Sequence, residues 1–176
     1  MDFTPERVRS EARWVADRAD VVVPLINDTR DRLGEAFDTT VDPVEPGAYR
    51  EAVATTFADG DVAVNVAAYV GLLRDLDVDG DYPGFVVDEV LGRELAAAIA
   101  GGTPLSLLAQ ATFHYADVTT HPPEEGANGS GGDAEAGAGI DDLDAALAAG
   151  FQTRLPGWAW RETESPFEVD PADIVE

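Results

Sequence analysis

Apolar residues recur along most of this chain with the three-to-four-residue spacing of a helix. The first such stretch begins at Thr4-Pro5-Glu6, which is typical of an N-cap, a first-turn proline and an acidic first turn. It continues to about Phe37, but Pro24 interrupts it. Proline removes one backbone hydrogen bond, and its ring clashes with the carbonyl four residues earlier. We therefore expect a kink, or a break into two helices, at Pro24.

Further helices are predicted from the same spacing. Residues 61–76 alternate like a strand at Val62, Val64 and Val66, yet they also fit a helical period. No partner strand is evident elsewhere, so we predict a buried helix. The segment after Thr103-Pro104 is apolar on nearly all sides, which predicts the central helix of the fold. Three more helices are expected, at residues 49–59, 85–100 and 140–150.

These elements predict an all-α fold, a bundle of five or six helices with a glycine-rich linker and an irregular aromatic tail. Residues 1–124 would form the helical core domain. Residues 125–139 have no side chain larger than Glu, cannot bury enough surface to offset their ordering entropy, and should be a flexible linker. Residues 140–176 would add a short helix and a tail with Trp158 and Trp160, which we expect to dock on the core because large aromatic residues are mostly buried.

The charge balance is strongly acidic. The chain has 35 Asp and Glu against 11 basic residues, all of them arginine, for a formal net charge of -24. Self-repulsion of this size opposes compaction unless salt screens it. This composition resembles that of cytoplasmic proteins from salt-in extreme halophiles, of the haloarchaeal type. The resemblance implies a cytoplasmic protein that requires high K+ or Na+ for folding, and the N-terminus shows no signal-peptide pattern.

We predict that helicity depends on salt. Far-UV circular dichroism should show helix gained between about 0.1 M and multimolar KCl, because the Debye length falls from about 10 Å to about 3 Å. Helicity and an unfolding midpoint that stay constant over this range would contradict the halophile interpretation.

Composition also excludes several classes of function. Without lysine there is no Walker A loop, no protein-kinase lysine and no Schiff-base amine. Without cysteine there is no disulfide, thiolate nucleophile or cysteine-ligated metal cluster. An acidic chain lacks the clustered cations that nucleic-acid binding needs, and no apolar run approaches membrane-spanning length. We therefore expect neither nucleic acid nor a membrane as partner.

One candidate metal site involves the two histidines. His114, Asp117 and His121 would share one face if the helix continued, and two imidazoles with a carboxylate suit Zn, Mn or Fe. Pro122 and Pro123 disfavour helix at His121, so the alternative is a pair of capping or surface histidines.

A second candidate is an aspartate-rich loop between two predicted helices. Its pattern, D-x-D-x-D-G, matches the first half of a calcium-binding EF-hand loop. The closing position, which should be a glutamate, is Val86, and a solvated acidic loop is the ordinary alternative. The candidate calcium ligands are Asp75, Asp77, Asp79 and Asp81.

The N-terminal arginines could bind an acidic partner, but the Arg7–Glu11 and Arg13–Asp17 spacings are also those of ordinary surface ion pairs. No catalytic motif is present, and no cofactor is expected unless Zn, Mn or Ca binds one of the two candidate sites. The sequence favours a non-catalytic protein-interaction or assembly domain, whose partner is another protein or itself. The alternatives are a metal-binding protein or metal-dependent hydrolase using the histidine site, and calcium binding by the aspartate loop.

Overall fold

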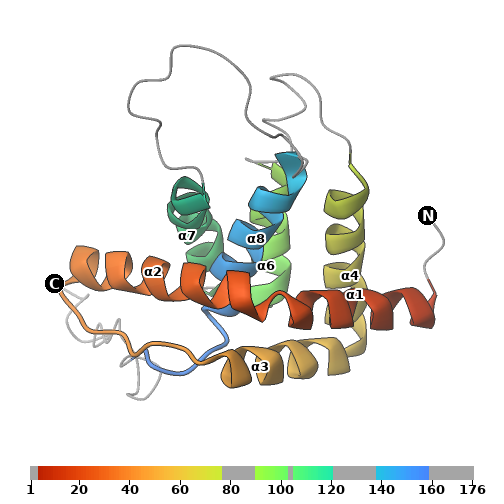
Figure 1. Ribbon diagram of the computed structural model, residues 1–176, viewed down its shortest axis with the longest axis horizontal. Helices are drawn as coiled ribbons and strands as arrows, with labels where there is room; N and C mark the ends of the chain where they lie inside the picture. Colours follow the sequence, from red (N-terminus) through yellow and green to blue (C-terminus); the bar gives the residue numbers. More distant parts are fainter. Residues whose placement is uncertain (1–3, 77–89, 103–104, 121–137, 159–176) are drawn as a thin grey trace, which may run out of the picture.

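The computed structural model describes residues 4–76, 90–102, 105–120 and 138–158, and the regular elements in these ranges are helices. Val41 and Trp158 form an isolated antiparallel bridge. The predicted all-α fold is confirmed. The helices are α1 (Pro5–Asp17), α2 (Ala19–Phe37), α3 (Pro46–Ala58), α4 (Gly60–Asp75), α6 (Gly92–Ala100), α7 (Leu105–Thr120) and α8 (Ala138–Phe151) (Figure 1).

The N-terminal stretch divides earlier than predicted. Thr4 caps α1 as expected, because its hydroxyl accepts a hydrogen bond from the Arg7 amide at 3.2 Å. The helix is interrupted at Arg18, however, and Pro24 lies inside α2 without ending it. Pro24 and Asp20 are both exposed, so water can reach the carbonyl that the proline leaves unpaired. The predicted break at Pro24 is therefore wrong, because the helix is interrupted at Arg18 instead.

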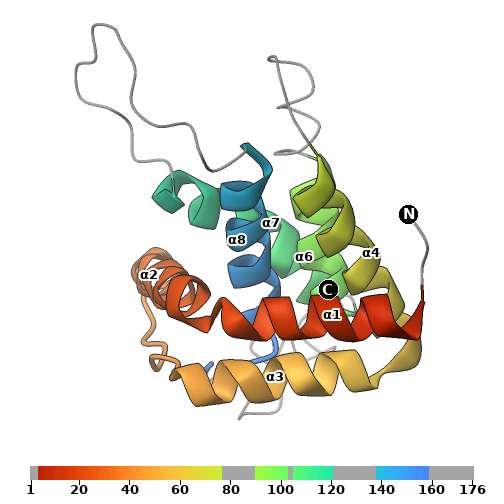
Figure 2. The same ribbon diagram turned by 45° about the vertical axis from the view of Figure 1, so that its right-hand side comes forward.

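The helices form two groups. α1 and α3 run side by side and lie across α4, α6 and α8, which are roughly aligned with one another (Figures 1 and 2). The stretch from Val62 to Val66 is helical, as predicted, within α4. Val66, Val70 and Leu73 bury one face of this helix in the common core, while Val64 on the other face is 47% exposed.

The centre of the core is α8, not the helix that follows Thr103-Pro104. Every residue from Asp142 to Thr153 is buried, and α8 packs between α6 and α7 (Figure 1). By contrast, α7 buries Phe113 and Ala116 but leaves Leu107 exposed. The small side chains of Ala145, Ala146, Ala148 and Ala149 in α8 are all buried, whereas α7 exposes Leu107 and Tyr115.

The aromatic tail closes against the end of α2. Trp158 is 2% exposed and packs with Leu33 and Val41. Its indole Nε1 donates to the carbonyl of Gln152 at 3.0 Å. Trp158 is therefore buried within the molecule, whereas Trp160 lies outside the described residues, and docking of the whole tail on the core stays a prediction.

The predicted linker also lies outside the described residues, except that its last two positions begin α8. The division into residues 1–124, 125–139 and 140–176 stays a prediction. The structure does place Leu143, Leu147 and Leu155 in one hydrophobic core with the preceding helices, whereas Trp158 packs in a separate cluster with Leu33 and Val41.

Because α8 packs closely against α6, we predict that a larger residue in place of Gly150 destabilises the fold. A methyl group there would lie 2.7 Å from Cβ of Ile99, which is fully buried. We expect Gly150→Ala to lower the free energy of unfolding by about 1–3 kcal/mol, the usual cost of overpacking. Gly47→Ala is the matched control, since no atom lies within 4 Å of the added methyl near the start of α3. It should be neutral or stabilise by up to about 1 kcal/mol.

Urea unfolding of both variants at one fixed KCl concentration measures the two effects. Equal changes at Gly150 and Gly47 would contradict the close approach of α8 to α6.

Candidate functional site

The residues of the predicted histidine site fall in and after α7. His114 is exposed and Asp117 is half-buried, one helical turn apart. His121 lies outside the described residues. The three-residue metal site therefore stays a prediction.

The predicted aspartate loop begins where α4 ends. Asp75 is the last residue of this helix, and its carboxylate lies 3.3 Å from the Arg7 guanidinium. Asp77, Asp79 and Asp81 lie outside the described residues. Within the described ranges, no group of three or more His, Asp or Glu side chains is arranged to hold a metal ion.

The N-terminal arginines are used partly inside the molecule. Glu11 is only 1% exposed. Its carboxylate forms ion pairs with Nε of Arg7 and with Nη1 of Arg74, each at an N···O distance of 2.6 Å. The predicted Arg7–Glu11 pair is thus confirmed, and Arg74 extends it to α4. Arg13 and Asp17 are both exposed and form no ion pair with each other in the described structure, so that predicted pair is wrong.

Arg18 joins the break between α1 and α2 to the central helix. Its Nε and Nη2 donate to the two carboxylate oxygens of Asp144, whose side chain is 4% exposed. Burial raises the pKa of Asp144, and the hydrogen bond from Arg18 partly offsets this effect. The same hydrogen bond raises the pKa of Arg18. The Arg18 guanidinium also lies 4.9 Å from the centroid of the Trp14 ring, within cation–π range.

Arg30 is buried to 1% exposure and ties α2 to the segment after α8. Nη1 donates to the carbonyls of Asp42 and Pro156, both at 2.7 Å. Nη2 donates to the carbonyls of Gln152 and Leu155, and the guanidinium lies 5.5 Å from the Trp158 ring centroid. These contacts hold the loop that carries Trp158, which gives Arg30 a structural role.

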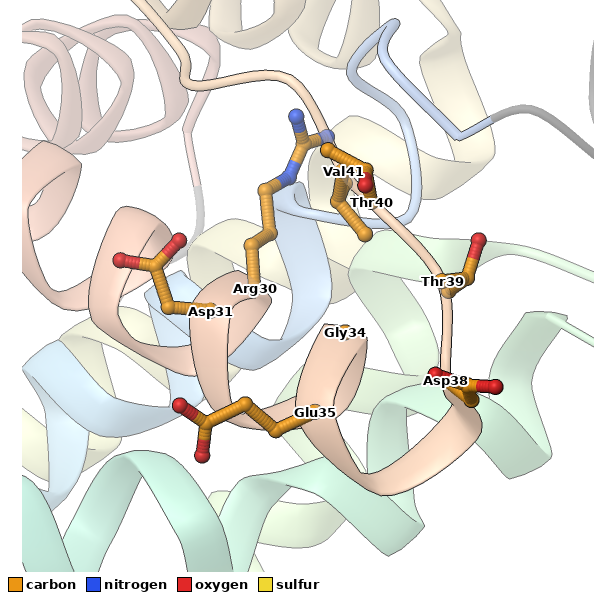
Figure 3. Close-up of a pocket in the computed structure, with 8 residues that line it drawn as sticks. All are labelled: Arg30, Asp31, Gly34, Glu35, Asp38, Thr39, Thr40 and Val41. Atoms are coloured by element: carbon orange, nitrogen blue, oxygen red, sulfur yellow. The ribbon is translucent and has the colours of Figure 1, made fainter.

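A hollow of about 450 Å³ lies at the C-terminal end of α2 (Figure 3). Asp31, Glu35 and Asp38 line it. In Figure 3 the carboxylates of Asp31 and Glu35 lie on one side and that of Asp38 on the other, while the Arg30 guanidinium points toward the loop at Val41. Because the three carboxylates do not converge, the hollow does not form a cation site.

A second hollow of about 330 Å³ lies between α3 and the segment after α8. Glu51, Thr55 and Arg154 are among its lining residues. The Arg154 Nε donates to the carbonyl of Ile99, so this cation holds the C-terminal turn of α6. The Thr55 hydroxyl donates to the backbone carbonyl of Glu51 at 3.0 Å, so its proton is not directed at a side-chain base.

The outer face of α7 is apolar, as is the face of α4 that carries Val64, Ala68 and Leu72. Leu107 is 58% exposed and Tyr115 is 45% exposed, and the exposed Ala111 lies between them. These three residues follow one another at i, i+4 and i+8, so they form one apolar ridge along the helix. We call them the α7 ridge.

The α7 ridge is also poor in charge. The 16 residues of α7 include one acidic residue, Asp117, and no arginine, in a chain with 35 acidic residues. His114 is exposed on the same side of the helix as the ridge. The sequence did not reveal the ridge, because a helix that is apolar nearly all round does not indicate which side its neighbours leave open.

Together these features define an all-α domain whose buried polar clusters hold helices together and whose described surface carries charge-poor apolar faces on α7 and α4. The family model described as Domain of unknown function (DUF7984) matches residues 1–171, and the chain belongs to this family. No curated protein and no solved structure matches the chain. None of the described helices is both long enough and apolar enough to cross a membrane.

Proposed function

We propose that this protein is a non-catalytic protein-interaction or assembly domain that works in a high-salt cytoplasm and binds through the α7 ridge. The observation that carries the proposal is the exposure of Leu107 and Tyr115 on one face of a helix. Exposed apolar patches rimmed by polar residues are typical of protein–protein contacts, and aromatic residues are enriched in them.

The contacts of the buried and half-buried arginines support a binding role over a catalytic one. Arg18, Arg30 and Arg74 each contact a buried partner or backbone carbonyl that connects two parts of the fold. Such contacts maintain the scaffold, which presents Leu107 and Tyr115 at its surface. A rigid scaffold that presents one apolar helix face is a common way to bind another protein.

The test uses the full chain in cells of its source organism. Size-exclusion chromatography of the lysate at multimolar KCl should place the protein well above the 18.6 kDa of one chain. Leu107→Glu should shift it to a smaller size. Val21→Glu is the matched control, because Val21 is 46% exposed on α2, next to the exposed Asp20, and the substitution adds the same charge. A wild-type protein that runs as a single free chain would overturn the proposed function.

A further inference from the structure

We infer that α1 is a hinged arm that opens as one unit while the other helices stay folded, and that a rise in salt loosens it. Opening of α1 would be independent of the α7 ridge. Three features support this motion: the small apolar surface that α1 buries, the polar contacts that hold it, and the interruption of the helix at Arg18.

α1 buries little apolar surface. Among its 13 described residues, Val15 alone is both apolar and buried, and Trp14 and Ala16 are only partly buried where they pack against the core. By contrast, α6 buries five of its 9 residues. Segments with few buried apolar contacts are those that open locally while the rest of a protein stays folded. Detachment of α1 therefore costs little apolar burial.

A polar contact holds α1 against α4. The Glu11 carboxylate, which is 1% exposed, pairs with Arg74 at 2.6 Å, and the Arg74 guanidinium lies 4.4 Å from the centroid of the Trp14 ring. Desolvation of the two charges offsets much of the attraction in such a pair. Arg7 lies on α1 itself and also pairs with Glu11, so the carboxylate would keep a cationic partner when α1 opens.

Arg18 provides the hinge. It is the single residue between α1 and α2, and its ion pair with Asp144 fixes it to α8. Hinges are commonly a few residues at the ends of elements, and they absorb the change in backbone angles. Opening would break the hydrogen bond from the Tyr49 hydroxyl to the Val15 carbonyl, 3.0 Å in the closed form. It would uncover the faces of α3 and α4 that α1 covers (Figures 1 and 2).

Salt should act on α1 and on the rest of the fold in opposite senses. α1 contains three arginines and three acidic residues and is therefore neutral, whereas the chain carries -24. Screening of self-repulsion favours compaction of the acidic helices, but it gives a neutral helix little. The same screening weakens the pair between Glu11 and Arg74, because the Arg74 side chain is 30% exposed. A rise in KCl would thus stabilise the core and loosen α1.

The experiment is native-state hydrogen–deuterium exchange of the purified full chain, read amide by amide, at KCl concentrations where circular dichroism shows it folded. The hydrogen-bonded amides of α1 should share one protection factor, at least about tenfold below that of α8, whose exchange reports global unfolding. As KCl rises, protection should increase in α8 and stay constant or fall in α1. Equal protection of the two helices, or a parallel rise with KCl, would overturn the arm.

Two variants on α1 test the contact that closes it. Glu11→Gln keeps the shape of the side chain but removes both ion pairs, so it should lower the protection of α1 about tenfold. Asp17→Asn is the matched control, because Asp17 is exposed at the C-terminus of α1, where the helix dipole disfavours a carboxylate. It should leave the protection of α1 equal or higher. Unchanged protection in Glu11→Gln would overturn the role of this contact.

A core variant separates opening of α1 from global unfolding. Ile99→Val removes one methyl group from a fully buried residue of α6 and should lower the protection of α8 about two- to tenfold. The protection of α1 should stay the same, because the core remains folded when α1 opens. A parallel fall in α1 would show that it opens only with the whole fold. This comparison and the KCl series decide the question even if Glu11→Gln does not fold.

Discussion

Arg18→Met is expected to lower the free energy of unfolding by about 3–5 kcal/mol, the usual cost of removing one partner from a buried ion pair. Asp144 would keep a carboxylate that is 4% exposed and has lost both hydrogen bonds from the guanidinium. The desolvation that already raises the pKa of Asp144 would then no longer be offset by Arg18. Urea unfolding at fixed KCl measures the change.

Arg32→Met is the matched control for this prediction. Arg32 forms an i, i+4 ion pair with Asp28, but the two side chains are 42% and 46% exposed. Exposed pairs contribute little, so the change should stay within about 1 kcal/mol. A similar loss for Arg18 and Arg32 would show that Arg18–Asp144 does not stabilise the junction of α1 and α2 with α8.

The double variant Arg18→Met/Asp144→Leu separates the pair from the packing around it. Removing both charges leaves no unpaired buried carboxylate, and apolar replacements of buried ion pairs are often neutral or stabilising. We expect the double variant to recover most of the stability that Arg18→Met loses. A double variant as unstable as the single one would instead indicate that the arginine acts through its contact with Trp14, 4.9 Å from the ring centroid.

Leu147→Ala is expected to lower the free energy of unfolding by about 2–5 kcal/mol, the range for leucine truncation in a packed core. Leu147 is fully buried in α8, at the centre of the molecule. The same substitution at Leu107, which is 58% exposed on α7, should change stability by no more than about 0.5 kcal/mol.

Urea unfolding of the two leucine variants compares the helices directly. Equal losses at Leu147 and Leu107 would mean that α7 is enclosed as deeply as α8. Because Leu107→Ala should leave the fold intact, it also provides a milder variant than Leu107→Glu for the chromatography of the lysate.

Much of the local structure was predictable because it depends on neighbouring residues. Thr4 followed by Pro5 predicted the start of α1, since an N-cap hydroxyl and a first-turn proline act within one helical turn. The stretch from Val62 to Val66 was ambiguous by periodicity alone, and the lack of a partner strand decided it correctly. The predicted break at Pro24 was wrong, because the exposed carbonyl of Asp20 can be hydrated and α2 continues through the proline, whereas the alternative of a kink stays a prediction.

The candidate sites were less predictable than the helices. His114 and Asp117 lie one turn apart as their spacing requires, but a site also depends on what surrounds the residues. The buried clusters around Glu11, Arg18 and Arg30 join residues far apart in the sequence, and composition shows only that arginine is the one cation available. The α7 ridge became visible only when the neighbouring helices were in place.

The sequence by itself determined the helical class of the fold, the N-cap of the first helix and the large negative charge, because each depends on local pattern or on composition. The tertiary structure alone decided that α8 is enclosed and that Leu107 is exposed. Periodicity shows which face of a helix prefers burial, but every helix with an apolar face has this preference. Which of them occupies the centre depends on how their side-chain volumes pack together, as the small alanines of α8 do between α6 and α7.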